Sequence, residues 1–247
     1  MKLGFCFLVK DGLNHVSLWT RFLAASAPGS VGVYVHAKTA SPSPVLKAAW
    51  VDPSPLATAW GDRSLVAATQ RLFRAAAEDQ CDAMVLLSGD MLPLQSFEWI
   101  QQFCRRNRLS LQPRDGLSER QLLANAKRFQ QLAPYFGLEL EQLRKQNMFF
   151  VIQRQEAIQI MAAAKLDDFP LTQLADEYYW INHLIRLQAD WHESKVVYCN
   201  PDPTRTQALD LRLTPDLLKT CREQGYGFIR KIRALDPQIS RDLESCY

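Results

Sequence analysis

The sequence predicts an α/β protein with a mostly parallel central sheet flanked by helices. Two observations lead to this prediction. The apolar runs LGFCFLV (residues 3–9) and AMVLL (residues 83–87) are continuous, which is typical of strands buried on both faces. Segments with apolar residues at helical spacing, such as HVSLWTRFLAAS, stand between such runs. This alternation of strand and helix through residue 90 favours a doubly wound sheet.

The elements of the first half follow in a regular order. The first run ends at Asp11-Gly12, and the second strand is bounded by Gly29 and Lys38. Ser and Pro are frequent between residues 41 and 60, which indicates a surface loop with a short strand in it. The expected order is a strand at 3–9, a helix at 15–26, a strand at 29–38, the loop at 41–60, a helix at 64–79 and a strand at 81–90.

The second half is less regular. Residues 105–145 are polar and basic, so we expect them to form loop and helix outside the sheet. The remaining expected elements are a strand running into a helix at 148–165, an aromatic helix at 173–184, a strand and loop at 190–206 and a basic tail at 225–236. The sequence has no internal repeat, and 247 residues are enough for one domain with a sizeable core.

Composition excludes several classes of protein. Hydrophobic residues make up 47% and charged residues 22%, which is ordinary for a globular protein and unlike a disordered chain. The formal net charge of +3 is small and dispersed, and no block of Lys and Arg is interleaved with aromatic residues. We therefore expect no nucleic-acid partner.

The cysteines and the apolar runs bear on the cellular location. The six cysteines show no C-x-x-C spacing, so we expect reduced, partly buried thiols and no zinc or redox motif. The apolar run after Lys2 is too short for a signal peptide or a bilayer span, and no later run reaches transmembrane length without a charge. These features predict a soluble, cytoplasmic protein with no integral membrane segment.

Three of the expected strands end in polar residues. Lys10-Asp11-Gly12, His36-Ala37-Lys38 and Ser88-Gly89-Asp90 follow strands that run in parallel, so they share the rim at which ligands bind in such sheets. A nucleotide fits such a rim, but neither G-x-G-x-x-G nor G-x-x-x-x-G-K-[ST] is present. Asp-x-Asp, which grips a metal ion under a diphosphate, is absent too. The negative charge of a diphosphate must then be neutralised by cationic side chains, such as Arg230 and Lys231. The alternative is that this pair belongs to a solvated tail.

Two further motifs have a structural and a functional interpretation. Asp176 and Glu177 open the aromatic helix, where acids stabilise a first turn, or one of them caps the helix while the other acts as a base. In Trp60-Gly61-Asp62-Arg63-Ser64, we expect Ser64 to be an N-cap with Trp60 packed beneath it. The four histidines show neither metal spacing nor a nucleophile partner.

Eight segments, taken in order, resemble the core-2/I-branching enzymes and peptide O-xylosyltransferases. They span nearly the whole chain, and their order and spacing are more specific than any one of them. The segments are FLVKDGLNHVSLWTRFL, VYVHAK, WGDRSLVAATQRLF, VLLSGDMLPL, QNMFFVIQRQEAI, DEYYWINHL, DW and FIRKI. The resemblance implies a GT-A-like, Rossmann-type fold and an inverting glycosyl transfer without a metal ion. It also implies one glycosyltransferase domain over residues 1–247, with a nucleotide-binding half (1–100) and an acceptor-binding, catalytic half (101–247).

The resemblance also implies roles for individual residues. Glu177 falls on the catalytic base and Asp176 on its supporting acid. The other implied or expected donor-binding residues are Lys10, Asp11, Gly12, His36, Arg63, Ser88, Gly89, Asp90, Arg230 and Lys231. His36-Ala37-Lys38 lacks the acid of the family motif, and Asp90 matches its motif only with a shift of one residue. We expect the rings of Tyr178 and Trp191 to stack against one face of an acceptor sugar. Packing in the core is the alternative for both residues.

The expected function is that of an inverting, metal-independent glycosyltransferase. It moves a sugar, GlcNAc or xylose by resemblance, from a UDP-sugar to a hydroxyl of a glycan acceptor and needs no cofactor. The alternative is a non-catalytic glycan- or nucleotide-binding module that retains the fold. A third reading, a nucleotide-dependent α/β enzyme of another reaction type, lacks the phosphate fingerprints. The expected partners are a nucleotide sugar and a glycan or glycosylated acceptor.

Overall fold

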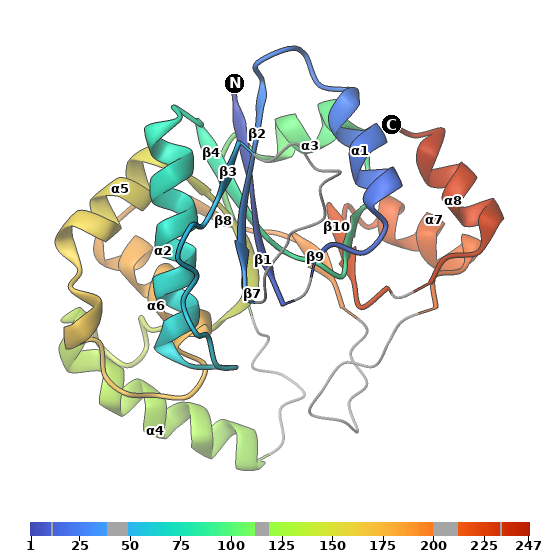
Figure 1. Cartoon of the computed structure of the whole chain (residues 1–247). Coiled ribbons are helices and arrows are strands. Elements are labelled where there is room, and N and C mark those ends of the chain that lie inside the picture. The colour runs from blue at the N-terminus through green and yellow to red at the C-terminus, as the bar shows by residue number, and fades with distance from the viewer. Residues whose placement is uncertain (11, 39–48, 112–118, 200–211, 233) are drawn as a thin grey trace.

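A seven-stranded sheet forms the centre of the computed structural model, which describes residues 1–10, 12–38, 49–111, 119–199, 212–232 and 234–247 (Figure 1). Its strands, in spatial order, are β3 (Trp50–Val51), β2 (Val31–Ala37), β1 (Leu3–Val9), β4 (Ala83–Ser88), β7 (Gln146–Gln153), β6 (Asn107–Leu111) and β8 (Trp191–Glu193). The predicted α/β class with helices on both sides of the sheet is confirmed.

Strand direction sets which chain ends meet at the functional rim. Strands β3, β2, β1 and β4 run parallel, whereas β7 is antiparallel to both β4 and β6. Strand β8 runs parallel to β6. The carboxyl ends of β1, β2, β4 and β6 therefore lie at one rim together with the beginning of β7. In β1 all residues but one are buried, which agrees with its continuous apolar sequence.

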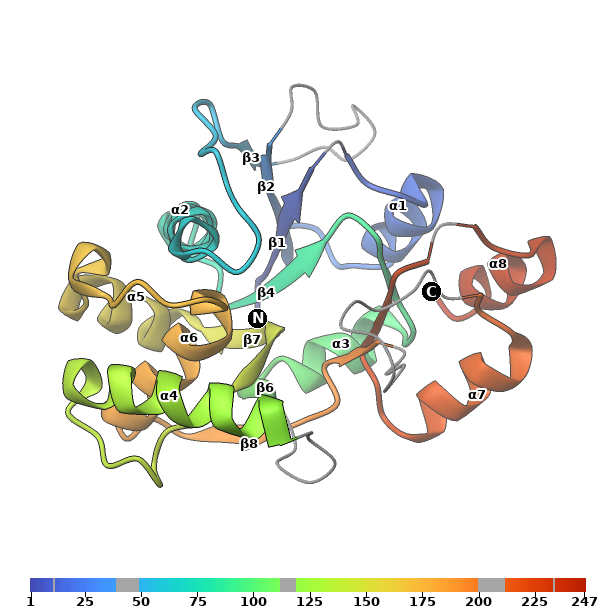
Figure 2. The same ribbon diagram turned by 90° about the horizontal axis from the view of Figure 1, so that it is seen from below.

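Helices cover both faces of the sheet (Figures 1 and 2). On one face lie α1 (Val16–Ala24) and α3 (Phe97–Phe103), and on the other lie α2 (Arg63–Glu78), α5 (Arg154–Ala163) and α6 (Ala175–Arg186). Aromatic contacts tie both layers to the sheet: Phe7 meets Trp19 of α1 at 5.0 Å between ring centroids, and Phe150 meets Trp180 of α6 at 5.8 Å. Helix α4 (Glu119–Phe136) packs outside α6.

A second, three-stranded sheet stands beside the first. It consists of β5 (Met91–Pro93), β10 (Phe228–Arg230) and β9 (Val197–Tyr198), with β10 in the middle. Helices α7 (Pro215–Glu223) and α8 (Pro237–Glu244) enclose a separate apolar cluster around Ile229. The indole N–H of Trp19 donates to the Met91 carbonyl at 2.8 Å, which joins this sheet to α1.

Three local expectations are wrong. The segment 105–145 contributes β6 to the central sheet, because residues of NRLSL pair with both β7 and β8. The expected basic tail forms the middle strand β10, whose Phe228 and Ile229 are fully buried. The N-cap of α2 is Asp62, which accepts from the Ser64 N–H at 2.8 Å, and Trp60 is 80% exposed and not packed beneath the helix. Residues 41–48 of the predicted loop lie outside the described residues.

Two glycines allow the loops after β1 and β4 to touch. A Cβ added at Gly89 would collide with the carbonyl oxygen of Gly12, and it would lie 3.2 Å from a methyl carbon of Val9. Gly12 itself has φ +149°, which L side chains rarely adopt. The backbones at these two positions are therefore in direct contact. The rim depends on the absence of a side chain at Gly89 and on the backbone conformation of Gly12.

We expect Gly89→Ala to lower the free energy of unfolding by about 2–3 kcal/mol, because its methyl group meets backbone that cannot move independently of β1. Urea titration of both proteins measures this difference. Gly227→Ala serves as the control, since its added Cβ approaches no atom closer than 3.4 Å. Equal unfolding midpoints for Gly89→Ala and the wild type would contradict the close approach.

Candidate active site

Three segments far apart in the chain are hydrogen bonded to one another at the rim. The Asn14 N–H donates to the Gly89 carbonyl at 2.7 Å, and the Asn14 side chain reaches the Ile232 carbonyl at 3.4 Å. His15 Nε2 lies 3.1 Å from the same Ile232 carbonyl, while the Ile232 N–H donates to the Asp90 carbonyl at 3.3 Å. We call residues 12–15, 88–90 and 230–232 the rim junction. It fixes the end of β10 against the ends of β1 and β4.

Arg230 occupies a partly buried position in this junction. One guanidinium nitrogen lies 3.5 Å from Asp90 Oδ2, and the guanidinium carbon stands 4.7 Å from the ring centroid of Phe149 in β7. The Ser88 hydroxyl donates to Asp90 Oδ1, which orients the carboxylate. Arg230 Nε is buried and has no hydrogen-bond partner among the described residues. Arg230 is thus held by its neighbours while a donor stays unused.

Lys231 follows with a left-handed backbone. Its φ of +69° is uncommon for a residue with a side chain and costs on the order of 1–3 kcal/mol. The hydrogen bond of Ile232 to Asp90 and the contacts of Asn14 and His15 hold this turn in place. The turn ends β10 and leaves Lys231 partly exposed beside Arg230. Strain of this kind persists where surrounding contacts over-determine it, as they do here.

The acid pair begins α6 on the other side of β7. Leu174, which precedes the helix, has φ +63° and makes no side-chain cap. The Ala175 N–H donates to the Gly61 carbonyl at 3.2 Å, and a Cβ at Gly61 would lie 3.1 Å from the Leu174 nitrogen. The loop before α2 therefore determines where α6 begins. Both acids lie in the first turn as predicted, and neither occupies the N-cap position, which is that of Leu174.

The two acids have different surroundings. Glu177 is partly exposed and forms an ion pair with Lys145, whose Nζ lies 2.9 Å from Oε2. Asp176 is buried, and its Oδ1 has no hydrogen-bond partner. Burial, with the nearby charge of Glu177 as a smaller cause, raises the pKa of Asp176 to about 7. The pair therefore offers one exposed carboxylate oriented by a cation and one buried carboxyl group that titrates near neutrality.

Strand β7 separates the cations from the acid pair. Figure 2 looks onto the rim and shows α6 on one side of β7 and β10 on the other. Arg230 stands over Phe149 within β7, and Lys145 immediately precedes this strand.

His36 lies outside this arrangement. Its side chain is 1% exposed, and Nε2 accepts from the Leu56 N–H at 2.9 Å. Nε2 also lies 3.8 Å from Asp52 Oδ2, and Arg71 pairs with the same Asp52 carboxylate. Burial lowers the pKa of His36, with Asp52 opposing the shift. The predicted nucleotide contact of this side chain is wrong, because the ring is enclosed and supports the loop at 52–56.

The two predicted acceptor-binding aromatic residues are misplaced for that role. Tyr178 has no exposed surface, its hydroxyl donates to Asn125 Oδ1 at 3.0 Å, and Phe129 packs edge-on against its ring. Trp191 begins β8 and pairs with Asn107 at the beginning of β6, which is the edge of the sheet opposite the rim. Core packing, the alternative considered from the sequence, accounts for Tyr178. We therefore assign neither Tyr178 nor Trp191 to the candidate site.

The other predicted donor-binding residues fall into two groups. Gly12, Ser88, Gly89, Asp90, Arg230 and Lys231 meet in or beside the rim junction. Arg63 lies elsewhere, at the beginning of α2, where its guanidinium donates to the Asp167 carbonyl at 3.3 Å. Lys10 is exposed at the end of β1, and Asp11 lies outside the described residues. The structure thus assembles about half of the predicted set at one place.

Three residues of the site were missed by sequence reasoning. Asn14 and His15 anchor the end of β10, and Lys145 pairs with Glu177. The position of Asn14 and His15 directly after a strand exit was a usable signal, since such loops line ligand sites in these sheets. No sequence pattern linked Lys145 to Glu177, because the order and direction of the strands bring them together.

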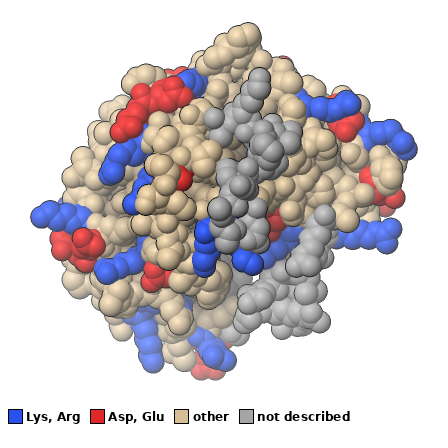
Figure 3. Space-filling view, in the orientation of Figure 1, with Lys and Arg blue, Asp and Glu red and all other residues tan. Residues whose placement is uncertain are grey.

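Outside the candidate site, the described residues form neither a basic surface on the face drawn in Figure 3 nor a cluster of metal-ligating side chains. On the face drawn in Figure 3, Lys and Arg side chains lie among Asp and Glu and form no continuous basic surface in the part that is coloured. Within the described ranges, no group of three or more His, Cys, Asp and Glu side chains could hold a metal ion. None of the helices there has both the length and the apolar composition needed to cross a membrane. All six cysteines are free.

The pKa of Asp176 predicts a pH-dependent stability. Its folded value of about 7 lies above the ordinary 3.8, so the folded state keeps its proton while the unfolded chain loses it. This group therefore lowers stability as pH rises from about 4 to about 7, by about 1.4 kcal/mol per pH unit at most. We expect Asp176→Asn to be about as stable as the wild type near pH 4 and more stable by a few kcal/mol near pH 8.

Urea unfolding of both proteins across this pH range measures the difference. Asp216→Asn, which changes an exposed aspartate in the first turn of α7, is the matched control for a buried one. A constant difference between Asp176→Asn and the wild type from pH 4 to pH 8 would show that Asp176 ionises normally in the folded protein.

Comparison with known proteins places this chain in a family. No curated protein matches the sequence. A crystal structure of an active-site mutant of LgtC is similar at 12% identity and a TM-score of 0.45 over 98% of this chain and 95% of that one, which is too weak a likeness to support an argument. The sequence model of the Core-2/I-Branching enzyme family matches residues 3–188, about three quarters of the chain. The chain therefore belongs to the Core-2/I-Branching enzymes, a family of glycosyltransferases.

Proposed function

We propose that this glycosyltransferase moves a sugar from a UDP-sugar to a hydroxyl of a glycan acceptor, with inversion and without a metal ion. GlcNAc or xylose is the sugar that the family resemblance favours. One observation carries the proposal: β10, which ends in Arg230 and is followed by Lys231, lies on one side of β7, and α6, which carries the partly exposed carboxylate of Glu177 in its first turn, lies on the other. In a single displacement the acceptor attacks one face of the sugar and the diphosphate departs from the other. The base and the cations must therefore lie on opposite sides of the sugar.

Glu177 takes the acceptor proton. The acceptor oxygen attacks the anomeric carbon of the donor while the bond from this carbon to the diphosphate oxygen breaks. The proton of the hydroxyl passes to the carboxylate as the new bond forms, and UDP departs from the opposite face of the sugar. A single displacement of this kind inverts the anomeric carbon. Lys145 holds the carboxylate in position through their 2.9 Å contact.

Arg230 and Lys231 stabilise the departing diphosphate. Fixed cations at the place where negative charge develops lower the barrier, since the protein need not reorganise during the reaction. The Arg230 side chain is 23% exposed, and guanidinium N–H groups are donors suited to phosphate oxygens. Asp90 Oδ2 lies 3.5 Å from one guanidinium nitrogen of Arg230 and helps to hold the group in place. These cations take the role that a divalent ion has in metal-dependent transferases.

Asp176 adds no second negative charge beside the acceptor at lower pH, because its carboxyl group is then protonated. Its pKa of about 7 means that the group is mostly neutral below this value, so Glu177 then carries the charge of the pair alone. Two carboxyl groups in one helical turn can divide the roles of structural acid and reactive base when their surroundings differ in this way.

A screen of nucleotide sugars tests the proposed function. Each candidate donor is incubated with the protein and a mixture of glycans, and release of the nucleoside diphosphate is measured. We expect release from a UDP-sugar, with product of inverted configuration at the anomeric carbon. Release only from a donor with another nucleotide, or retention of configuration, would overturn the proposal.

We expect Glu177→Gln to lower the transfer rate by about 10²- to 10⁴-fold, the usual contribution of a general base. Donor binding should change little, because Glu177 faces the acceptor. Steady-state kinetics and UDP titration measure these two quantities. Glu223→Gln is the matched control, since Glu223 also pairs with a lysine, Lys219, on an exposed helix. A transfer rate within twofold of the wild type would remove Glu177 from the mechanism.

We expect Arg230→Ala and Lys231→Ala to weaken UDP binding by about 1.5–3 kcal/mol each, the range for hydrogen bonds to charged groups. Calorimetric titration in the presence of EDTA measures this and tests metal independence at once. Arg241→Ala, on the exposed surface of α8, is the control. The diphosphate assignment fails if both variants bind UDP as tightly as the wild type. Metal independence fails if the wild type binds UDP only after a specific metal is restored.

A further inference from the structure

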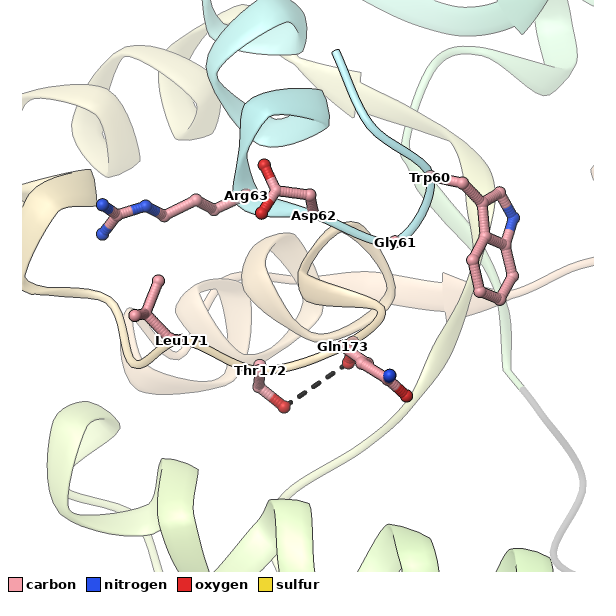
Figure 4. A pocket seen from close by; sticks show the side chains of 7 residues that line it. All are labelled: Trp60, Gly61, Asp62, Arg63, Leu171, Thr172 and Gln173. Atoms are coloured by element: carbon pink, nitrogen blue, oxygen red, sulfur yellow. Dashed lines mark hydrogen bonds between the residues drawn. The ribbon is translucent and has the colours of Figure 1, made fainter.

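A pocket lies between the loop before α2 and the segment before α6. Its volume is about 320 Å³, and it is lined by Trp60, Gly61, Asp62, Arg63, Leu171, Thr172 and Gln173. Figure 4 shows the two segments facing each other, with Trp60 and Arg63 pointing to opposite sides of Gly61 and Asp62. We call this the Trp60 pocket. None of its residues belongs to the rim junction.

Two large apolar side chains at this pocket are exposed. Trp60 is 80% and Leu171 74% exposed, which makes them the most exposed large apolar side chains of the described chain. A single exposed apolar residue needs no explanation, but an exposed tryptophan and leucine at the same pocket indicate an interaction site. The indole offers a flat apolar face that no described aromatic ring covers.

Polar groups beside the apolar ones narrow the class of ligand. Arg63 uses one guanidinium nitrogen for the Asp167 carbonyl at 3.3 Å and has further N–H donors. Gln173 contributes an amide whose Oε1 accepts a 3.4 Å bond from Arg128. The Thr172 hydroxyl donates only a long 3.4 Å bond to the Gln173 carbonyl (Figure 4). Asp62 offsets the charge of Arg63. An aromatic face with neutral donors and acceptors suits a sugar, whose C–H face stacks on a ring and whose hydroxyls form hydrogen bonds.

The pocket is attached to the helix that carries the proposed base. The Gly61 carbonyl accepts from the Ala175 N–H at 3.2 Å, and Gln173 precedes Glu177 by one turn of chain. Strand β10, which ends in Arg230, lies on the far side of β7 from α6 (Figure 2). A ligand in this pocket is therefore close to the acceptor side of the reaction and apart from the diphosphate.

We propose that the Trp60 pocket binds a neutral sugar unit of the glycan acceptor, one or more units away from the hydroxyl that reacts. This inference rests on the proposed function. Trp60 stacks on the sugar ring, and Thr172 and Gln173, which lie between Trp60 and Leu171 in Figure 4, bind its hydroxyls. The pocket thereby selects acceptors that extend beyond a single sugar. Arg63 points away from Trp60 and takes no part in binding this sugar.

The test observes Trp60 directly. In protein labelled with ¹⁵N-tryptophan, each of the six indole N–H groups gives one signal, and Trp60→Phe identifies the signal of Trp60 by its loss. The protein is titrated with β-linked and α-linked disaccharides and trisaccharides of glucose, galactose and GlcNAc, and separately with UDP. Concentrations reach about 50 mM, at which a site with a millimolar Kd is largely filled.

We expect at least one saccharide to move the Trp60 signal to saturation, and UDP to leave it in place. Trp60→Ala should weaken binding of that saccharide about tenfold, the effect of losing one stacked ring, whereas Trp60→Phe should keep most of the affinity. Leu171→Ala should weaken it less. Ile158→Ala, an exposed aliphatic residue on α5, is the control and should bind the saccharide like the wild type. The variants change exposed side chains, so melting temperatures should stay within about 2 °C.

The outcomes separate this inference from the proposed function. The inference is overturned if no saccharide of the panel moves the Trp60 signal, if UDP moves it instead, or if Trp60→Ala binds as tightly as the wild type. The proposed function is judged on donor cleavage and UDP binding, which do not require this pocket. Saccharide binding at Trp60 without any donor cleavage would retain the pocket and refute the proposed reaction.

Discussion

The contact between the loops after β1 and β4 is the constraint on which the site depends. Gly12 and Gly89 allow two backbones to touch, and the Asn14 N–H then reaches the Gly89 carbonyl. This contact creates the surface on which Ile232 docks, through Asp90 on one side and Asn14 with His15 on the other. The end of β10, and with it Arg230 and Lys231, is positioned by one backbone hydrogen bond to Asp90 and by the side chains of Asn14 and His15.

The proposed base, Glu177, is also held in place, in this case by the packing of helix α6 against the sheet. Helix α6 lies against the sheet through buried aromatic rings, with Trp180 against Phe73 and Phe150, so its first turn cannot shift without disturbing the core. Sites built on packed helices are more precisely placed than sites on loops. Glu177 therefore gains a fixed position from residues that take no part in the chemistry.

Several unfavourable features gather at the rim. Leu174 and Lys231 have left-handed backbones, Asp176 Oδ1 and Arg230 Nε are buried without hydrogen-bond partners, and Trp60 is exposed. Each costs stability in the unliganded protein. Such features are not confined to the site, because Gln80 and Gln188 also have left-handed backbones and buried polar atoms of Glu156, His183 and Arg222 also lack a hydrogen-bond partner among the described residues. Strain and unpaired groups therefore do not by themselves locate the reaction, which is assigned from the positions of the cations and of Glu177.

The sequence by itself determined the parallel half of the sheet and the chemistry of two residue pairs. Strands buried on both faces appear as continuous apolar runs, so β1, β2 and β4 were predictable, and so was the rim they share. The acids 176–177 and the cations 230–231 stood out locally as charged pairs beside apolar segments. Their presence could be inferred, but not their distance from each other.

Only the tertiary structure decided which of these residues meet. The antiparallel direction of β7 brings Lys145 to the rim, the pairing of β10 with β5 turns a basic tail into a buried strand, and the burial of Tyr178 and His36 removes them from the site. Trp60 was expected beneath a helix and lies in the open. Such outcomes depend on contacts between residues distant in sequence, and the period of a local pattern shows that a face is apolar without showing what will cover it.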